Sequence, residues 1–374
     1  MAAVQPGLRV DLPPSSVAVV LGTRPEIIKL AHIIRLLGPA ARVIHTGQHY
    51  DANLSEVFFG AFGLSPPGHY LEVGGEHRGV QIGEATTRLT RLLEDDPARA
   101  VVVQGDTNAV MAGALAANAT ETPLVHVEAG LRSHDRAMPE EHNRVVCDHL
   151  SDLCLAPTQT AAGKLEKEGI TCDRVAVTGN TVVEAVGTLL PEADRRAEAL
   201  ARHGLAPNGF ILSTFHRPEN VDHPQTWKAI LSDLARLPLP VVLALHPRSR
   251  RRAVSFGLEP LLDRLQVIDP LPYPEFLSLL AECALAVSDS GGLQEEVSVL
   301  KRPMVVVRNS TERPEVIGTF AVLRSPGDHI DEAVIQIIET LEYTHSRLVE
   351  TPTPYGDGTA SVRSVTLIEK LVAG

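Results

Sequence analysis

Three acidic side chains in the first half of the chain stand where strand-like segments end or where a helix begins. Asp106 follows VVVQG, Glu128 follows LVHV, and Glu140 opens a helical segment after a proline. Parallel strands end at one edge of a sheet, so we expect these carboxylates to gather there. Crowded carboxylates shift each other's pKa, which suits general acid–base catalysis. Simpler roles stay open: Glu140 as an ion-pair partner of Arg144 or a favourable charge at a helix N-terminus, and Asp106 as the cap of a helix starting at Thr107.

A charged turn follows the first apolar segment, at residues 17–21. Its sequence GTRPE places Arg24 just beyond the end of the expected strand, and Lys29 comes one turn further on. Ligands of open parallel sheets bind beyond the carboxyl ends of the strands, so this turn should face the ligand. Arg24 and Lys29 would then supply positive charge for an anionic ligand. The alternative is an ordinary helix start followed by a solvated lysine.

The sequence DSGGLQEE, at residues 289–296, follows the strand-like segment ALAVS and opens a helix. Free backbone N–H groups and the helix dipole at such a terminus favour phosphate binding. Ser290 lies there, and Gly291 and Gly292 would let the backbone approach a pyrophosphate closely. Glu296, about one turn into the helix, could accept hydrogen bonds from both hydroxyls of a ribose. The alternative is a plain glycine-rich turn, and the spacing is not the GxGxxG of nicotinamide sites.

Two more basic groups follow strand-like segments of the second half. His216, in TFHRPEN, is a candidate proton carrier or phosphate donor, because it ends a strand and precedes an arginine. A lone histidine is more often structural. Arg313, in RNSTERPE, could contact uracil or a phosphate, or could pair with Glu312 or Glu315.

Metal and redox sites find little support. The four cysteines, at positions 147, 154, 172 and 283, form no CxxC pair, which argues against a zinc ribbon or a thioredoxin-like site and fits a reducing cytoplasm. His45 and His49 are four residues apart, but they span a strand end and a loop without an obvious carboxylate nearby. We therefore expect no metal and no cofactor.

Composition restricts the classes of partner. The net charge of −12 argues against a nucleic-acid partner, which would need a basic surface. No apolar run is long enough to span a membrane. The first sixteen residues lack an apolar signal core, and we expect a short frayed tail there. With 44% hydrophobic but only 4% aromatic residues, the core should be aliphatic.

Strand-like and helix-like segments alternate, which predicts an α/β fold of doubly wound parallel sheets. The length of 374 residues favours two domains. The expected strands are 17–21, 42–45, 100–104, 124–127, 153–156 and 175–177 in the first half, and 210–213, 241–245, 267–268, 285–287 and 304–307 in the second. The expected helices include 25–37, 109–119, one from about 139, 191–203 and 361–372. We place the domain junction near residue 180; periodicity alone does not assign the last helix to either domain.

The ordered motifs GTRPEIIK, TGQHYD, QGDT, HVEAGLRS, MPEEHNR, TGNTV, HRPEN, DSGGLQEE and TERPE resemble those of the non-hydrolysing UDP-N-acetylglucosamine 2-epimerases, especially their archaeal and actinobacterial branch. The resemblance covers nearly the whole chain. It implies a glycosyltransferase-B-like fold of two Rossmann-like domains, residues 1–180 and 181–360, with a cleft between them and helix 361–374 returning to the first domain. The residues that it implies for the active site are Arg24, Lys29, Asp106, Glu128, Glu140, His216, Phe276, Ser290, Gly291, Gly292, Glu296 and Arg313.

The resemblance also implies a reaction, the reversible C2 epimerisation of UDP-N-acetylglucosamine to UDP-N-acetylmannosamine. The C2 proton is not flanked by a carbonyl, so we expect UDP to leave C1 as a base removes that proton, giving a 2-acetamidoglucal to which UDP adds back. Asp106, Glu128, Glu140 and His216 are assigned the proton transfers as a group. A hydrolysing 2-epimerase that releases N-acetylmannosamine, a glycosyltransferase and a non-catalytic sensor are the rival functions. We expect a cytoplasmic homodimer in polysaccharide or aminosugar biosynthesis.

Two positions depart from the family pattern. Leu271 stands where many relatives carry glutamine near the uracil. Asp51 follows the motif GQHY, where relatives that bind a second UDP-N-acetylglucosamine as an activator carry glutamine. A carboxylate beside a pyrophosphate would repel it, so we expect turnover without an activator.

Overall fold

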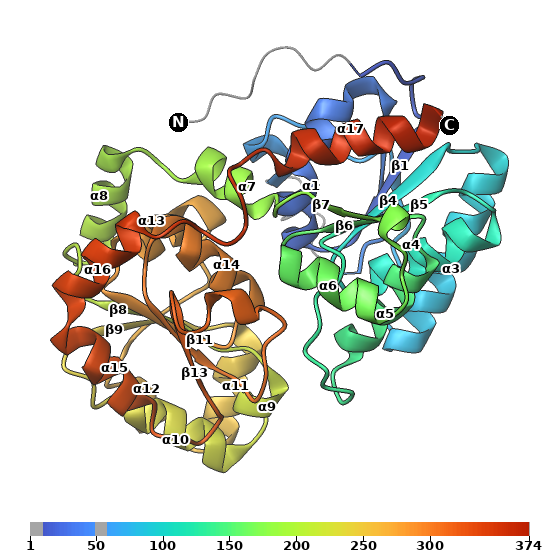
Figure 1. The fold of residues 1–374 in the computed structure, drawn as a ribbon. Helices are drawn as coiled ribbons and strands as arrows, with labels where there is room; N and C mark the ends of the chain where they lie inside the picture. Colours follow the sequence, from blue (N-terminus) through green and yellow to red (C-terminus); the bar gives the residue numbers. More distant parts are fainter. Residues whose placement is uncertain (1–9, 49–57, 374) are drawn as a thin grey trace. The chain divides into compact units, whose positions relative to one another are not determined.

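The computed structural model describes residues 10–48 and 58–373. The chain forms two compact units: unit 1 comprises Met1–Thr188 and Tyr355–Gly374, and unit 2 comprises Leu189–Pro354. Unit 2 is thus inserted into unit 1, and the chain passes between the units twice (Figure 1). The junction expected from sequence lies near residue 180.

Unit 1 is built on a parallel sheet that has seven strands among the described residues, in the order β3-β2-β1-β4-β5-β6-β7. The strands are β1 (Val17–Leu21), β2 (Ala41–His45), β3 (His69–Tyr70), β4 (Ala100–Gln104), β5 (Leu124–Val127), β6 (Leu153–Ala156) and β7 (Val175–Val177). The central strands β1, β4 and β5 are buried along their whole length. Burial on both faces explains their continuous aliphatic sequences, because helices cover both sides of a doubly wound sheet.

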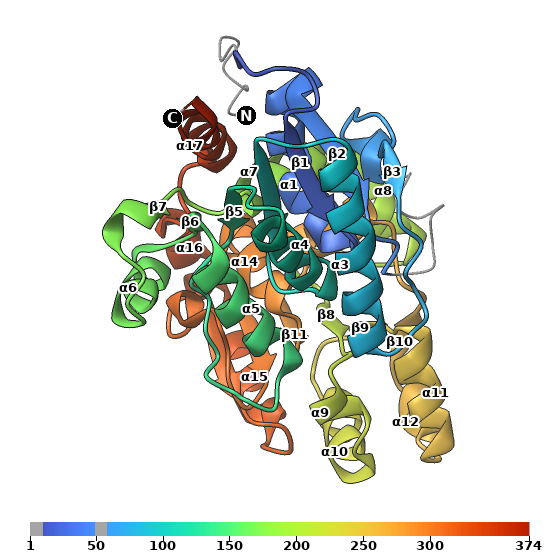
Figure 2. The same cartoon turned by 90° about the vertical axis from the view of Figure 1, so that its right-hand side faces the viewer.

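The helices of unit 1 are α1 (Arg24–Leu37), η1 (Gly38–Ala40), α3 (Arg78–Asp95), α4 (Asn108–Ala119), α5 (Pro139–Leu150), α6 (Gln159–Lys167), η2 (Cys172–Arg174), α7 (Val182–Leu189) and α17 (Ala360–Ala373). Helices α3 and α4 run side by side and make the most extensive helix–helix contact of the unit (Figure 2). Proline starts α5 and stands second in α1, where its missing N–H has no helical partner to lose.

The last helix, α17, belongs to unit 1 and packs against α1 (Figure 1). At its start the backbone N–H of Ser361 donates to Oε1 of Glu184 in α7, at 2.8 Å. The second carboxylate oxygen of Glu184 and the hydroxyl oxygen of Ser361 are buried as well. Burial raises the pKa of Glu184 from 4.5 to about 7.

This raised pKa predicts that Glu184→Gln stabilises unit 1 at alkaline pH. The folded state binds the Glu184 proton more tightly than the unfolded chain does, so its contribution to stability is complete below pH 4.5 and is lost as the pH rises through 7. Glutamine carries no charge, so the variant should gain roughly 1–3 kcal/mol over wild type at pH 8 and nothing at pH 4.5. Urea unfolding followed by circular dichroism measures this gain.

The control is Glu94→Gln, because Glu94 is an exposed glutamate of the same unit. A gain for Glu184→Gln that is the same at both pH values would contradict the explanation.

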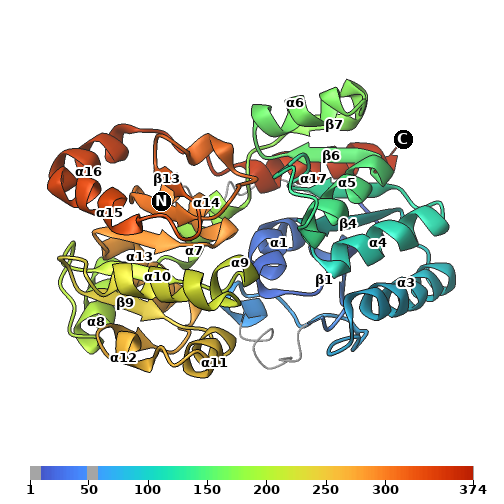
Figure 3. The same ribbon diagram turned by 90° about the horizontal axis from the view of Figure 1, so that it is seen from below.

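Unit 2 is built on a parallel sheet with six described strands, in the order β10-β9-β8-β11-β12-β13. They are β8 (Ile211–Thr214), β9 (Val241–Ala244), β10 (Gln266–Ile268), β11 (Leu285–Ser288), β12 (Met304–Val307) and β13 (Ala321–Arg324). The helices are α8 (Ala193–Arg202), α9 (Pro218–Val221), α10 (Pro224–Leu234), α11 (Pro247–Ser255), α12 (Glu259–Leu262), α13 (Tyr273–Glu282), α14 (Gly291–Leu300), η3 (Pro314–Val316), α15 (Ile330–Glu339) and α16 (Leu341–Glu350). In Figure 3, α15 and α16 lie toward the β13 edge of this sheet.

The predicted α/β class and its two doubly wound parallel sheets are confirmed, and each strand expected from sequence is present within one or two residues. Among the strands of residues 10–48 and 58–373, β3 and β13 were missed. Each lies at an edge of its sheet and has one described neighbour. Within residues 10–48 and 58–373, no helix combines the length and apolar character needed to cross a bilayer.

Candidate active site

Glu128 follows β5 directly and is held in an unusual backbone conformation. Its φ is +68°, in the left-handed region that non-glycine residues seldom occupy. Lys29, in the second turn of α1, forms an ion pair with Oε2 of Glu128, and the two side chains are only 8% and 5% exposed. The solvated-lysine alternative is therefore wrong. A strained backbone that holds a buried charge is typical of functional sites.

Asp106 lies two residues after β4 and pairs with Arg144 of α5, which also bonds Glu141 at 2.7 Å. The side chain of Asp106 remains 31% exposed. Thr107 caps α4, because its hydroxyl accepts the N–H of Val110. The alternative that Asp106 caps this helix is therefore wrong, and the carboxylate stays available beside a buried guanidinium.

Glu140 lies in the first turn of α5 and is half-buried. Arg144 pairs with Asp106 and Glu141 instead, and in the described part of the chain no ion pair involves Glu140, so the proposed Glu140–Arg144 pair is wrong. The position at a helix N-terminus does favour a carboxylate. Asn143 donates to the carbonyl of Asp106 at 2.7 Å, which ties the start of α5 to the loop that carries Asp106.

A charged network that sequence reasoning missed fixes the segments around Asp106 and Glu128. His126 Nδ1 bonds Asp148 at 2.6 Å, and its Nε2 bonds the carbonyl of Gly105 at 2.8 Å. Because both partners are acceptors, both ring nitrogens carry protons. Burial alone would lower the pKa of His126, but the neighbouring Cys147 and Asp148 raise it well above the ordinary value. Asp148 also accepts from Arg132 at 2.6 Å and from the N–H of Gly130 at 3.2 Å, so one carboxylate orders residues 126–132.

The GTRPE turn is joined to the Asp106 loop by Glu26. One carboxylate oxygen of Glu26 accepts from the N–H of Gly22 (3.1 Å) and the hydroxyl of Thr23 (2.7 Å), and the other accepts from Thr107 (2.9 Å). Burial raises the pKa of Glu26 to about 7 against the effect of these hydrogen bonds. Arg24 stands exposed at the start of α1. Unit 1 thus holds Arg24 and Lys29 of α1 and the loop residues Asp106 and Glu128 at the carboxyl ends of its strands.

In unit 2, α14 begins with the glycine pair expected to bind phosphate. Ser290 is the N-cap and accepts the N–H three residues further on. A Cβ on Gly291 would lie 2.7 Å from both Arg313 and Glu312, whereas a Cβ on Gly292 would meet nothing within 4 Å. Gly291 therefore makes room for the chain's own side chains, and only Gly292 opens a space beside the helix N-terminus. The sequence had given both glycines the same role.

Arg313 is bound by carboxylates of its own unit. Its Nε bonds Glu295 at 2.6 Å, and Nη1 pairs with Glu312. The pairing with Glu312 that the sequence left open is thus observed. The side chain is only 7% exposed.

Glu296 lies in the second turn of α14, half-buried, and accepts a hydrogen bond from the hydroxyl of Tyr273 at 2.8 Å. Burial and the neighbouring Glu296 raise the pKa of Tyr273 well above its ordinary value, so the phenol stays a donor. Phe276 lies in the first turn of the same helix as Tyr273, and Leu271 precedes that helix; both are half-buried. The contact between α13 and α14 at this point thus joins Tyr273 to Glu296.

His216 is oriented by a buried carboxylate that sequence reasoning did not assign. Its Nδ1 lies 3.0 Å from Oδ1 of Asp289, which is fully buried, while half of the His216 side chain is exposed. Asp289 also accepts the backbone N–H groups of His216 and Arg217 and the amide of Asn220. Burial would raise the pKa of Asp289, but His216 and these hydrogen bonds lower it. A histidine anchored through Nδ1 presents Nε2 for proton transfer. The sequence does show an acidic residue, Asp289, directly after β11. The last residue of β11 pairs with the last residue of β8, which brings Asp289 near His216.

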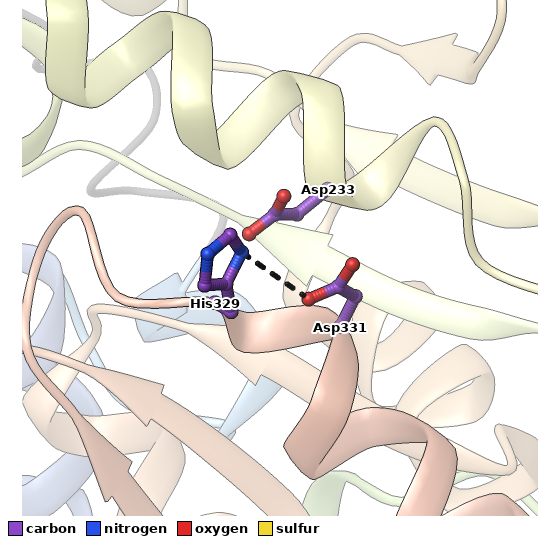
Figure 4. A group of neighbouring side chains, drawn as sticks. All are labelled: Asp233, His329 and Asp331. Atoms are coloured by element: carbon purple, nitrogen blue, oxygen red, sulfur yellow. Dashed lines mark ion pairs between the residues drawn. The ribbon is translucent and has the colours of Figure 1, made fainter.

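One group in the described residues has the spacing of metal ligands: Asp233, His329 and Asp331 (Figure 4). Arg236 pairs with both aspartates, and Asp233 accepts the N–H of Ile330 at the start of α15. These contacts explain the cluster as an ion-pair and helix-capping arrangement. It contains none of the residues expected at the active site.

The two glycines of α14 allow a matched prediction. Gly292→Ala should weaken UDP binding by roughly 10- to 100-fold, because a methyl group would occupy the space at the helix N-terminus and remove charge-assisted hydrogen bonds worth about 1.5–3 kcal/mol. Its stability should be unchanged or slightly raised, since alanine favours helices. Calorimetric titration with UDP measures the binding.

Gly291→Ala is the counterpart, because its methyl group would collide with Arg313 and Glu312 and should lower the unfolding midpoint. Wild-type UDP affinity in Gly292→Ala would place the nucleotide elsewhere.

The two doubly wound parallel sheets, one in each unit, are those of the glycosyltransferase-B-like fold class. A family model described as UDP-N-acetylglucosamine 2-epimerase matches residues 39–369. The chain belongs to this family, and it is an epimerase.

Individual relatives are similar over nearly their whole length. The UDP-N-acetylglucosamine 2-epimerase of Methanocaldococcus jannaschii is 36% identical over 363 residues, covering 94% of this chain and 98% of the relative. A Pseudomonas aeruginosa UDP-2,3-diacetamido-2,3-dideoxy-D-glucuronate 2-epimerase is 35% identical, covering 94% and 99%. The M. jannaschii enzyme in complex with UDP-GlcNAc and UDP has a TM-score of 0.84 at 36% identity, covering 95% and 99%. The Neisseria meningitidis enzyme bound to UDP-GlcNAc has a TM-score of 0.85 at 31% identity, covering 96% and 100%.

Asp51, on which the expected independence from an activator rests, lies outside the described residues.

Proposed function

We propose that this protein interconverts UDP-N-acetylglucosamine and UDP-N-acetylmannosamine without releasing free sugar. The observation that carries the proposal is the buried Lys29–Glu128 pair at the end of β5, on a strained backbone and tied through its neighbours to the loop of Asp106. A nucleotide sensor would need the α14 terminus but not this arrangement.

The proposed reaction has two steps, elimination of UDP and its re-addition, and it needs separate residues for nucleotide binding and for proton transfer. A base removes the C2 proton, its electron pair forms the C1–C2 double bond, and the C1–O bond breaks with its electrons leaving on UDP. UDP then adds back to C1 while an acid delivers a proton to the other face of C2. Unit 2 binds the nucleotide through Gly292, Glu296 and the α14 terminus, and Arg24 adds positive charge. Asp106, Glu128, Glu140 and His216 carry the protons.

The test is NMR of UDP-N-acetylglucosamine with the enzyme in D2O. The product should carry one deuterium at C2, because the proton removed exchanges on the enzyme and the proton added comes from a different group. An oxygen label in the C1–O bridge should scramble into the non-bridging positions of the β-phosphate. Retention of the C2 hydrogen, or of the label during product formation, would refute elimination.

The same spectra separate the rival functions. Free N-acetylmannosamine with UDP would show a hydrolysing enzyme, and turnover without an acceptor excludes a glycosyltransferase. The Pseudomonas relative is nearly as similar to this chain as the M. jannaschii enzyme is. UDP-2,3-diacetamido-2,3-dideoxy-D-glucuronate is therefore the second substrate to assay. We expect the higher kcat/KM for UDP-N-acetylglucosamine.

We also propose a cytoplasmic location and a homodimer. All four cysteines are free, three of them buried, which is compatible with a reducing compartment. The homodimer is expected from the resemblance of the sequence, and light scattering of the purified protein tests it.

A further inference from the structure

Asn180, from the motif TGNTV, is buried between β7 and α7, and hydrogen bonds of its side chain and its backbone fix its position. Its side-chain Nδ2 donates to Oε2 of Glu128 at 3.0 Å. Its Oδ1 accepts the N–H of Val182 at 3.0 Å. Its backbone N–H donates to the carbonyl of Tyr355 at 2.8 Å, where the chain re-enters unit 1. None of the residues expected at the active site belongs to this motif.

These bonds determine which end of the amide faces Glu128. The N–H of Val182 can only donate, so the amide oxygen of Asn180 must point toward it. The NH2 group is therefore directed at Glu128. Oε2 of Glu128 receives two donors, the amide of Asn180 and the ammonium of Lys29. Hydrogen bonds to a charged acceptor are the stronger ones, so this pair fixes the carboxylate in one orientation.

The backbone around Asn180 is equally restricted. Gly179 has a φ of +89°, and a Cβ at this position would lie 3.0 Å from the carbonyl oxygen of Tyr355. Only glycine fits where the two segments cross so closely. The position of Asn180 thus follows from this crossing, and the orientation of Glu128 follows from Asn180.

We propose that Asn180 is a positioning residue for the epimerisation, which holds the carboxylate of Glu128 in the orientation for proton transfer. This inference rests on the proposed function, in which Glu128 carries a proton. Misplacing a reacting group by about 1 Å costs on the order of 100-fold in rate. Asn180 is only 3% exposed, and we assign it no contact with UDP or the sugar, so its loss should lower kcat and leave UDP affinity unchanged.

Two substitutions distinguish positioning from simple structural support. Asn180→Ala removes the donor and should lower kcat by roughly 10- to 100-fold at every pH. Asn180→Asp keeps the size and shape of the side chain but places a second carboxylate next to Glu128. Lys29 is the charged group that already faces Glu128 at this point. The introduced carboxylate repels Glu128 when it is ionised, whereas it can donate a hydrogen bond to Glu128 when it is protonated. The kcat of this variant should therefore recover relative to wild type as the pH falls from about 8 toward about 5.

The control for loosened packing is Glu184→Ala, which removes the acceptor for Ser361 at the start of α17 and touches neither Glu128 nor Asn180. It should lower the unfolding midpoint and keep the wild-type pH profile of kcat. Wild-type kcat in Asn180→Ala, or an Asn180→Asp profile parallel to wild type, would overturn the positioning role. Absence of turnover in the wild-type enzyme would instead refute the proposed function.

Discussion

Replacing Glu128 with glutamine should lower kcat by roughly 10²- to 10⁴-fold, the range for a positioned acid or base. Glutamine has nearly the shape of glutamate and can still turn an oxygen toward Lys29 and Asn180, so the loop should keep its conformation. What it loses is the capacity to carry a proton. The UDP affinity should stay unchanged, because we assign Glu128 no contact with the nucleotide. Rates measured under substrate saturation, with calorimetry for UDP, check both expectations.

The matched control is Glu121→Gln. Glu121 also has a left-handed backbone, with φ +53°, but lies exposed in the turn after α4. Its variant should have wild-type kcat. If Glu128→Gln retains full turnover, Glu128 transfers no proton, and the assignment passes to Asp106, Glu140 and His216. Release of free 2-acetamidoglucal and UDP by the variant would show that elimination outruns reprotonation.

The second large effect concerns stability. Asp148→Asn should destabilise unit 1 by roughly 3–5 kcal/mol, because it removes the buried negative charge that His126 and Arg132 share. The new amide would also direct N–H donors at groups that are donors themselves. At neutral pH the buried imidazolium would have to lose its proton or remain without a counterion. Urea unfolding followed by circular dichroism measures the change.

Asp152→Asn is the control, four positions along the chain. Asp152 is exposed and accepts one backbone N–H, from Leu124 at 2.8 Å, and asparagine can keep that bond. The only tryptophan, Trp227, is buried in unit 2, so its fluorescence reports that unit separately. A defect centred on unit 1 should make part of the circular dichroism signal disappear at lower urea concentration. A lower urea midpoint in the Trp227 fluorescence alone would contradict this expectation.

The fold was predictable where strands are buried on both faces. Sequences such as VAVVL in β1 and MVVV in β12 leave no polar face, which only a covered parallel sheet allows. The missed edge strand β3 gave no such signal. β3 consists of His69 and Tyr70 alone, and it owes its existence to pairing with β2 rather than to its own residue types.

The placement of the candidate residues at strand ends was predictable, but their pairings were not. The rule that ligands gather at carboxyl ends of strands made Asp106, Glu128 and His216 candidates, and each does follow a strand. The partner of Arg144 was not predictable, because helical spacing allows both Glu140 and Glu141. The choice is made by Asp106, thirty-eight residues away, which draws the guanidinium to the strand end. Asp289 was missed because its role depends on β11 and β8 being neighbours.

The insertion of unit 2 into unit 1 has a consequence for synthesis. Domains usually fold as their residues leave the ribosome, from the N-terminus onward. Unit 1 begins to emerge first, but it cannot be completed first. Its last helix, α17, packs on α1 and is translated after every strand of unit 2. Until then the α1 surface that α17 covers stays exposed. A chain that ends at residue 354 and has been released from the ribosome should therefore contain a protease-resistant unit 2 and a protease-sensitive unit 1.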